Sequence, residues 1–188
     1  MTGSVVPATR ERLLQLLIER SFKRQKVVLS SGKESDFYID CKKTALLAEG
    51  HFLVGHLFYE SIRAHAGTAV GVGGLTMGAD PLASAVSLVS HQMGKPLHAF
   101  FVRKEPKGHG TGQWIEGLAA FDKGAKVAIV EDVVTTGAST IKAIERARAE
   151  GLNPVAAFAL VDRDEGGREA IEQTGVKVHS LFKRQDFP

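Results

Sequence analysis

The sequence predicts an α/β protein with a central, mostly parallel sheet flanked by helices. Short apolar strands alternate with helical stretches from residue 46 onward, and this order is typical of parallel sheets. The connections between them are rich in glycine and polar residues, as loops over a sheet usually are. At 188 residues the chain is expected to form a single domain with at most a small appendage.

Each predicted element follows from a local pattern. Apolar residues at helical spacing behind the plausible N-cap Thr9 predict a helix over 9–24. Asp80 and Pro81 are read as the N-cap and first residue of another helix. The other predicted elements are strands at 26–29 and 36–40, a helix at 46–66, strands at 68–72, 96–102 and 126–132, a helix at 139–151, a strand at 153–163, a short helix at 166–175 and a strand at 177–183.

The composition is that of an ordinary globular protein, with 44% hydrophobic and 24% charged residues. A net charge of +3 is too small to indicate a nucleic-acid binder by itself. No apolar run approaches the roughly 18 residues of a membrane span, and the first residues do not resemble a signal peptide. The single Cys41 excludes a disulfide framework within the chain and is expected to be buried. We therefore expect a cytoplasmic protein without membrane or nucleic-acid partners.

The stretch KVAIVEDVVTTGAST (126–140) combines two acids with a turn suited to an anion. Backbone N–H groups and the dipole at a helix N-terminus favour a phosphate, and Gly137 permits a close approach. A phosphate would be repelled by Glu131 and Asp132, so these acids are expected to face sugar hydroxyls or a divalent cation. A ligand with a phosphate, a ribose and a magnesium-bound tail would satisfy the stretch. The alternative is that the acids only complement the helix dipole.

This stretch resembles the signature of type I phosphoribosyltransferases: four apolar residues, two acids, two apolar residues and Thr-Thr-Gly. The resemblance implies that family's fold, with an N-terminal helix and hood over about 1–45 and a core over about 46–188. It also implies Mg²⁺ as cofactor and 5-phosphoribosyl 1-pyrophosphate (PRPP) as donor, the acids holding its ribose and the turn its 5-phosphate. The residues implied to contact PRPP here are Glu131, Asp132, Val133, Val134, Thr135, Thr136, Gly137, Ala138 and Ser139.

A second motif lies in the glycine-rich loop 103–113, where the order Arg-Lys-x-x-Lys-x-His-Gly resembles the catalytic loop of orotate phosphoribosyltransferases. The resemblance implies that Arg103, Lys104, Lys107 and His109 contact PRPP. Lys107 and His109, with Asp132, are the implied catalytic residues. It further implies a homodimer in which this lid reaches the neighbouring subunit's site. The alternative is a solvated surface loop.

Two further stretches are similar to the same family: SSGKESDFYIDCK (30–42) and VDRDEGG (161–167). By this similarity Thr135 and Arg163 contact orotate, whose carboxylate suits a planar guanidinium. The alternative for Arg163 is a structural ion pair with Asp162 or Asp164. Either Phe37 or Tyr38 is expected to face a planar base, although core packing is the commoner fate.

The sequence departs from some relatives at two positions, where Ser30 and Met77 replace lysines. Lys33 and the backbone N–H groups of 74–76 are candidates to compensate. The implied activity is transfer of a phosphoribosyl group to orotate, giving orotidine 5′-monophosphate and pyrophosphate in pyrimidine (UMP) biosynthesis. Two rivals are considered: a purine specificity, which Arg163 opposes, and a nucleotide-sensing regulator, which the complete lid opposes.

Overall fold

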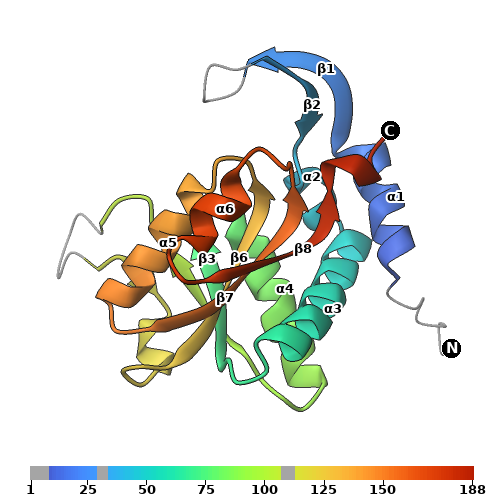
Figure 1. Cartoon of the computed structure of the whole chain (residues 1–188). Coiled ribbons are helices and arrows are strands. Elements are labelled where there is room, and N and C mark those ends of the chain that lie inside the picture. Colours follow the sequence, from blue (N-terminus) through green and yellow to red (C-terminus); the bar gives the residue numbers. More distant parts are fainter. Residues whose placement is uncertain (1–8, 29–33, 107–112) are drawn as a thin grey trace, which may run out of the picture.

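A six-stranded sheet forms the centre of the protein, as the computed structural model of residues 9–28, 34–106 and 113–188 shows (Figure 1). Its strand order is β5-β4-β3-β6-β7-β8, with parallel pairing throughout except for the antiparallel edge pair β4–β5. The strands are β3 (Gly71–Leu75), β4 (His98–Val102), β5 (Ile115–Glu116), β6 (Lys126–Val134), β7 (Asn153–Asp162) and β8 (Lys177–Lys183). The predicted α/β fold with a mostly parallel sheet is confirmed.

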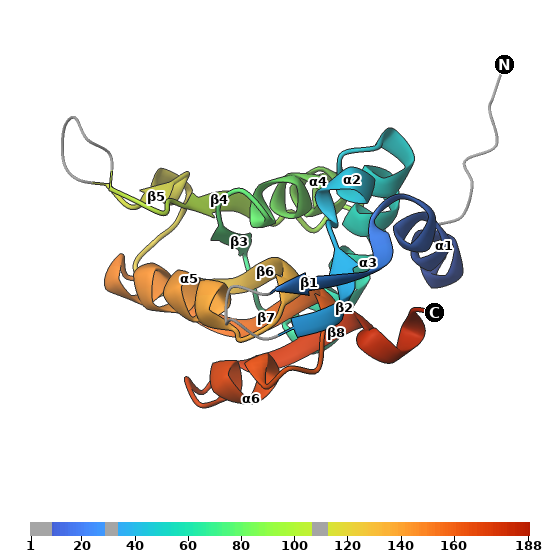
Figure 2. The same ribbon diagram turned by 90° about the horizontal axis from the view of Figure 1, so that it is seen from above.

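Helices cover both faces of this sheet (Figure 2). One apolar core lies between the sheet and α1, α3 and α4, and includes Phe58, Val86 and Phe158; the other lies under α5 and α6 and includes Ile129, Ile144 and Ile171. The helices are α1 (Arg10–Arg20), α2 (Lys42–Ala45), α3 (Ala48–His65), α4 (Ala79–Gln92), α5 (Ala138–Ala149) and α6 (Gly167–Glu172), with short 3₁₀ turns at Leu118–Ala120 and Arg184–Asp186. Among these described residues, no helix has the length and apolar character needed to cross a bilayer.

An antiparallel pair of strands, β1 (Phe22–Val28) and β2 (Glu34–Ile39), stands apart from the main sheet and above the edge where β6 and β7 end (Figure 1). We call this pair the hood. Aromatic packing of Phe37 between Phe22 and Phe187 joins the hood to the C-terminal residues. Parallel strands end at the same edge, where ligands bind in open α/β sheets, so the hood lies over the expected site.

Several predicted boundaries are corrected by the structure. The first helix ends at Arg20, and the residues from Phe22 to Arg24 belong to β1 instead. Asp80 is not the N-cap of its helix: α4 already begins at Ala79, and Asp80 lies in its first turn. The N-cap at Thr9 is confirmed, because its hydroxyl accepts the Arg12 N–H at 3.1 Å.

The predicted strand at 68–72 lies three residues further along, at 71–75, because its glycines are strand residues rather than a loop. A Cβ on Gly73 would collide with the Phe100 carbonyl oxygen, and one on Gly74 with the Val130 carbonyl oxygen. Glycine is a poor strand former in general, but here only glycine permits this close packing. The sequence pattern alone therefore placed the strand too early.

We expect Gly74→Ala to lower the free energy of unfolding by about 1–3 kcal/mol, because the added methyl group overlaps the main chain of β6 and the Ala79 side chain. Urea denaturation measures the change. Val70→Ala is the control, since Val70 is exposed in the same segment and its truncation should alter stability by less than about 0.5 kcal/mol. Equal stability of wild type and Gly74→Ala would contradict the tight packing of β3 against β6.

Candidate active site

Two carboxylates lie near the end of the central strand β6, which continues beyond the predicted end at 132 to Val134. Glu131 is buried, and the Thr140 hydroxyl donates a hydrogen bond to its Oε2 at 3.3 Å. Burial, and next the adjacent Asp132 carboxylate, raises the pKa of Glu131 well above its ordinary value. The two adjacent acids are therefore stabilised by any ligand that donates hydrogen bonds or carries positive charge.

The orientation of Asp132 is defined on three sides. Its Oδ1 accepts the N–H of Val133 at 2.9 Å. The carboxylate lies directly over Gly78, where a Cβ would be 2.5 Å from Oδ1. Its Oδ2 is 3.8 Å from the ammonium of Lys42. One oxygen is thus occupied by the main chain, and the other faces a cation.

A cavity of about 350 Å³ opens beside these acids. The loop between β3 and α4 also lines it, and there the Thr76 hydroxyl donates to Asp80 Oδ2 at 2.5 Å. The lining residues are Lys42, Leu75, Thr76, Met77, Gly78, Lys104, Glu131, Asp132 and Ser139. Both carboxylates and two lysines thus face one compartment, large enough for a phosphorylated ligand.

The turn from Val134 to Ser139 encloses a second, smaller cavity of about 120 Å³. Gly137 has a φ of +81°, and α5 begins directly after it, so the unpaired N–H groups of the first helical turn lie at this turn. Its lining residues are Glu131, Val133, Val134, Thr135, Thr136, Gly137, Ala138, Ser139 and Thr140. Glu131 and Ser139 belong to both linings, so the two cavities are neighbours.

Arg163 follows the end of β7 and lies beneath the hood. It is buried, its guanidinium carbon is 5.3 Å from the Phe37 ring centroid, and it lines a third cavity of about 420 Å³. Burial lowers its pKa from the ordinary value. Its ion pair is with Glu165 at 2.9 Å, which corrects the expected alternatives Asp162 and Asp164.

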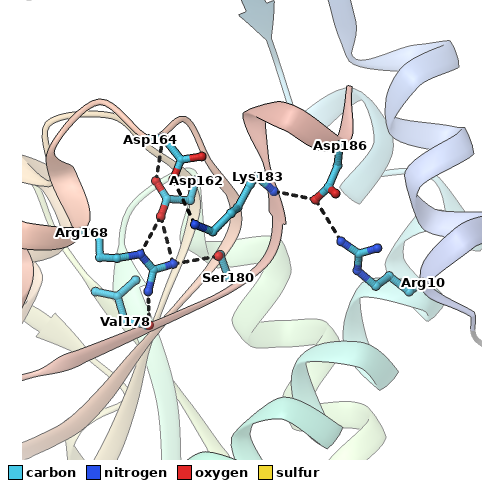
Figure 3. Close-up of polar contacts among 8 residues, drawn as sticks. All are labelled: Arg10, Asp162, Asp164, Arg168, Val178, Ser180, Lys183 and Asp186. Atoms are coloured by element: carbon cyan, nitrogen blue, oxygen red, sulfur yellow. Dashed lines mark hydrogen bonds and ion pairs between the residues drawn. The ribbon is translucent and has the colours of Figure 1, made fainter. Parts of the chain in front are cut away.

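A separate polar network holds the turn that carries Arg163 (Figure 3). Buried Asp162 binds Arg168 of α6 through two contacts, at 3.1 and 3.0 Å, and accepts the Asp164 N–H at 3.0 Å. Arg168 in turn donates to the Val178 carbonyl and to Ser180 on β8. Asp162 and Asp164 thus position this turn instead of neutralising Arg163.

The lid residues are placed only in part. Lys104 lines the cavity beside the acids, as expected for a ligand contact. Arg103 instead pairs with Glu116 of β5 at 3.0 Å. Lys107 and His109 lie outside the described residues, so their roles remain predictions.

Among the other candidates, Phe37 is buried by its aromatic neighbours and Tyr38 is half-buried, and Ser30 and Lys33 lie outside the described residues. Sequence reasoning missed Lys42. The only signal was the pair of lysines after the hood strand, and nothing in the pattern distinguishes Lys42 from Lys43.

Comparison with known proteins agrees with this geometry. A family model described as the phosphoribosyl transferase domain matches residues 44–181. The chain is 52% identical to the orotate phosphoribosyltransferase of Sorangium cellulosum (strain So ce56), over 95% of this chain and 92% of that protein. It is 47% identical to the orotate phosphoribosyltransferase of Aquifex aeolicus (strain VF5), over 95% of this chain and 97% of the relative.

Solved structures give the same result. The Mycobacterium tuberculosis H37Rv orotate phosphoribosyltransferase in complex with Fe(III) dicitrate superimposes with a TM-score of 0.80 at 36% identity, over 94% of this chain and 97% of that one. The same enzyme in complex with 5-phospho-α-D-ribosyl 1-diphosphate matches with a TM-score of 0.76 at 35% identity, over 94% and 97% of the two chains.

The fold is thus that of a type I phosphoribosyltransferase, and the chain belongs to this family. Within the family it belongs with the orotate phosphoribosyltransferases, because the relatives described above carry that name and match this chain over nearly their whole length. The resemblance drawn from the sequence is confirmed.

We expect Glu131→Gln to stabilise the free protein at neutral pH, because it replaces a carboxyl whose ionisation is disfavoured by burial and by Asp132, and because it keeps an acceptor for Thr140. A carboxyl whose pKa is raised by folding binds its proton more tightly in the folded state. It therefore stabilises the fold fully below its ordinary pKa of about 4.3, and this stabilisation is lost as the pH rises through the folded pKa. The gain over wild type should therefore grow from acidic to neutral pH, as urea denaturation at a series of pH values would show.

Glu145→Gln on the exposed face of α5 is the matched control and should show no such pH-dependent gain. Parallel stability curves for wild type and Glu131→Gln would contradict the raised pKa of Glu131.

Proposed function

We propose that the chain joins orotate to the phosphoribosyl group of PRPP. N1 of orotate loses its proton to water and forms a bond to C1 of the ribose, while the bond from C1 to the pyrophosphate oxygen breaks with its electron pair leaving on pyrophosphate. The products are orotidine 5′-monophosphate and pyrophosphate. No covalent protein intermediate is required. The protein acts by orienting two ligands and stabilising charge as the bond breaks. The observation that carries the proposal is the acid pair, Glu131 and Asp132, between a phosphate-sized turn and a cavity lined by lysines.

In this proposal PRPP spans the two neighbouring cavities. The 5-phosphate occupies the turn of residues 135–139, where helix N–H groups and hydroxyls are donors. The ribose hydroxyls donate to Glu131 and Asp132, and the pyrophosphate extends toward Lys104 and the Thr76 loop. Because Glu131 and Ser139 line both cavities, one ligand can satisfy both ends of the site.

Mg²⁺ fits the donor set at this site as part of the PRPP complex. Mg²⁺ is usually bound by one or two carboxylates together with substrate phosphates and water, and Glu131 and Asp132 supply two hard oxygen ligands beside the cavity. Over the described ranges no cluster of three His, Cys, Asp or Glu is present. Glu131 and Asp132 would hold the ion together with oxygens of the bound substrate. When bound, the ion supplies positive charge to the departing pyrophosphate.

Orotate is proposed to bind beneath the hood with its carboxylate on Arg163 and a further contact to Thr135. Arg163 is held by a turn that Asp162 and Arg168 fix, and its planar guanidinium suits a carboxylate. The free site pairs Arg163 with Glu165, so this guanidinium is already oriented toward a carboxylate. Purines carry no such group, which favours orotate over a purine acceptor.

The lid and a homodimer complete the proposal. Lys107 and His109 are proposed to approach the leaving group from the neighbouring subunit, with Arg103 released from Glu116. The support for the dimer is the resemblance of the 103–109 loop to the catalytic loop of orotate phosphoribosyltransferases.

The direct test is to measure orotate consumption with PRPP and Mg²⁺, alongside uracil and purines. Only orotate should be consumed, and Asp132→Asn should lower kcat/KM by about 10²-fold or more through loss of the ribose contact. Asp122→Asn, at an exposed loop position, should behave as wild type. Near-normal turnover by Asp132→Asn would refute the ribose role, and consumption of uracil at the same rate would refute the role of Arg163.

Sharing of the lid is tested by mixing two inactive variants, Lys107→Ala and Arg163→Ala. If the lid acts across the interface, mixed dimers contain one intact site each, and about a quarter of wild-type activity should return at equal amounts. If the lid acts within its own subunit, every site retains one defect. Confirmed mixed dimers without activity would therefore contradict sharing.

A further inference from the structure

Lys42 lies between the hood and the acid pair. It is the first residue of the short helix α2, directly after β2 and the residues Asp40 and Cys41. Asp40 Oδ1 accepts its backbone N–H at 3.3 Å and pairs with its ammonium at 3.0 Å. One carboxylate therefore fixes both the main chain and the side chain of Lys42.

The Lys42 ammonium is directed at the reaction site. It lies 3.8 Å from Asp132 Oδ2 and lines the same cavity as both carboxylates and the Thr76 loop. A separation of 3.8 Å is an ion pair without a direct hydrogen bond. An ammonium carries three donors, so Lys42 keeps donors for a ligand that enters beside Asp132.

The negative charge of the two acids in this cavity makes a nearby cation necessary for binding a further anion. Glu131 and Asp132 both line it, and a pyrophosphate would bring further negative charge against them. Met77 also lines the cavity, and its side chain supplies no charge. Lys104 lines the cavity from the lid, whereas Lys42 is held in place by Asp40 on the body of the protein.

We propose that Lys42 is a pyrophosphate-binding residue: its ammonium binds the diphosphate of PRPP while its ion pair with Asp132 keeps that carboxylate turned toward the ribose. This inference rests on the proposed function and deepens it. It assigns a permanent cation to the diphosphate end of the cavity, on an element separate from both the lid and the Thr76 loop. The orotate end, beneath the hood at Arg163, does not involve Lys42.

The test uses the full-length protein and two direct probes, inorganic pyrophosphate and ribose 5-phosphate, each titrated calorimetrically with Mg²⁺. Lys42→Ala should weaken pyrophosphate binding by about tenfold or more, the size of one charge-assisted hydrogen bond. Ribose 5-phosphate binding should change by less than about twofold on that scale. In steady-state assays KM for PRPP should rise while KM for orotate stays constant.

Two further variants separate charge from structure. Lys43→Ala is the matched control, because Lys43 is the exposed neighbour of Lys42 in the same helix, and it should bind both probes like wild type. Lys42→Arg should restore much of the pyrophosphate affinity. Urea denaturation of each variant establishes that the comparison is made between folded proteins.

The outcomes divide cleanly. Unchanged pyrophosphate binding in Lys42→Ala overturns the proposal, and so does equal weakening of both probes, which would show that Lys42 acts only through Asp132 or the fold. A wild-type protein that does not bind pyrophosphate overturns it as well. A wild type that binds pyrophosphate but does not consume orotate refutes the proposed function instead. The calorimetric comparison of wild type with Lys42→Ala still tests the role of Lys42 in that case.

Discussion

The parallel pairing of β6 between β3 and β7 is the constraint on which the site depends. It brings the ends of three strands to one edge, and each end contributes a different part: the loop with Thr76 after β3, the acids and turn of β6, and the turn with Arg163 after β7. The pairing continues to that last turn, since the Arg163 N–H donates to the Val134 carbonyl at 3.0 Å. A shift of one residue in either ladder would exchange inward and outward side chains and separate these groups.

Close main-chain packing maintains this arrangement, and glycine makes it possible. Gly74 allows β3 to lie against β6, Gly78 allows the loop to lie under Asp132, and Gly167 allows α6 to approach the turn at Thr135. The acid pair adds an opposing electrostatic cost, because Glu131 is buried beside a second carboxylate. The close glycine contacts and the pair of acids lie at the same edge of the sheet. Binding sites commonly contain such groups, which lower folding stability but serve ligand binding.

The sequence predicted the architecture and the acid-and-turn motif well because both are contiguous patterns. Hydrophobic periodicity located most strands, and residues 131–139 form one uninterrupted stretch that lines two neighbouring cavities. The predictions that the structure corrects concern features that depend on contacts between distant segments of the chain. The glycine strand β3 was placed early because only Phe100 and Val130 explain its glycines. The ion pair of Arg163 is with Glu165, which was not among the two acids named for the structural alternative. Lys42 was missed because its link to Asp132 spans ninety positions of sequence.

The ion pair of Arg163 with Glu165 also bears on selectivity. In the proposed site an incoming carboxylate replaces one that the protein already supplies, so binding is an exchange of anions on a single guanidinium. The net gain is the difference between two similar ion pairs, and a ligand without a negative group has nothing to exchange. Glu165 thus competes with the acceptor for Arg163, so in the proposed site an acceptor needs a negative group to displace it.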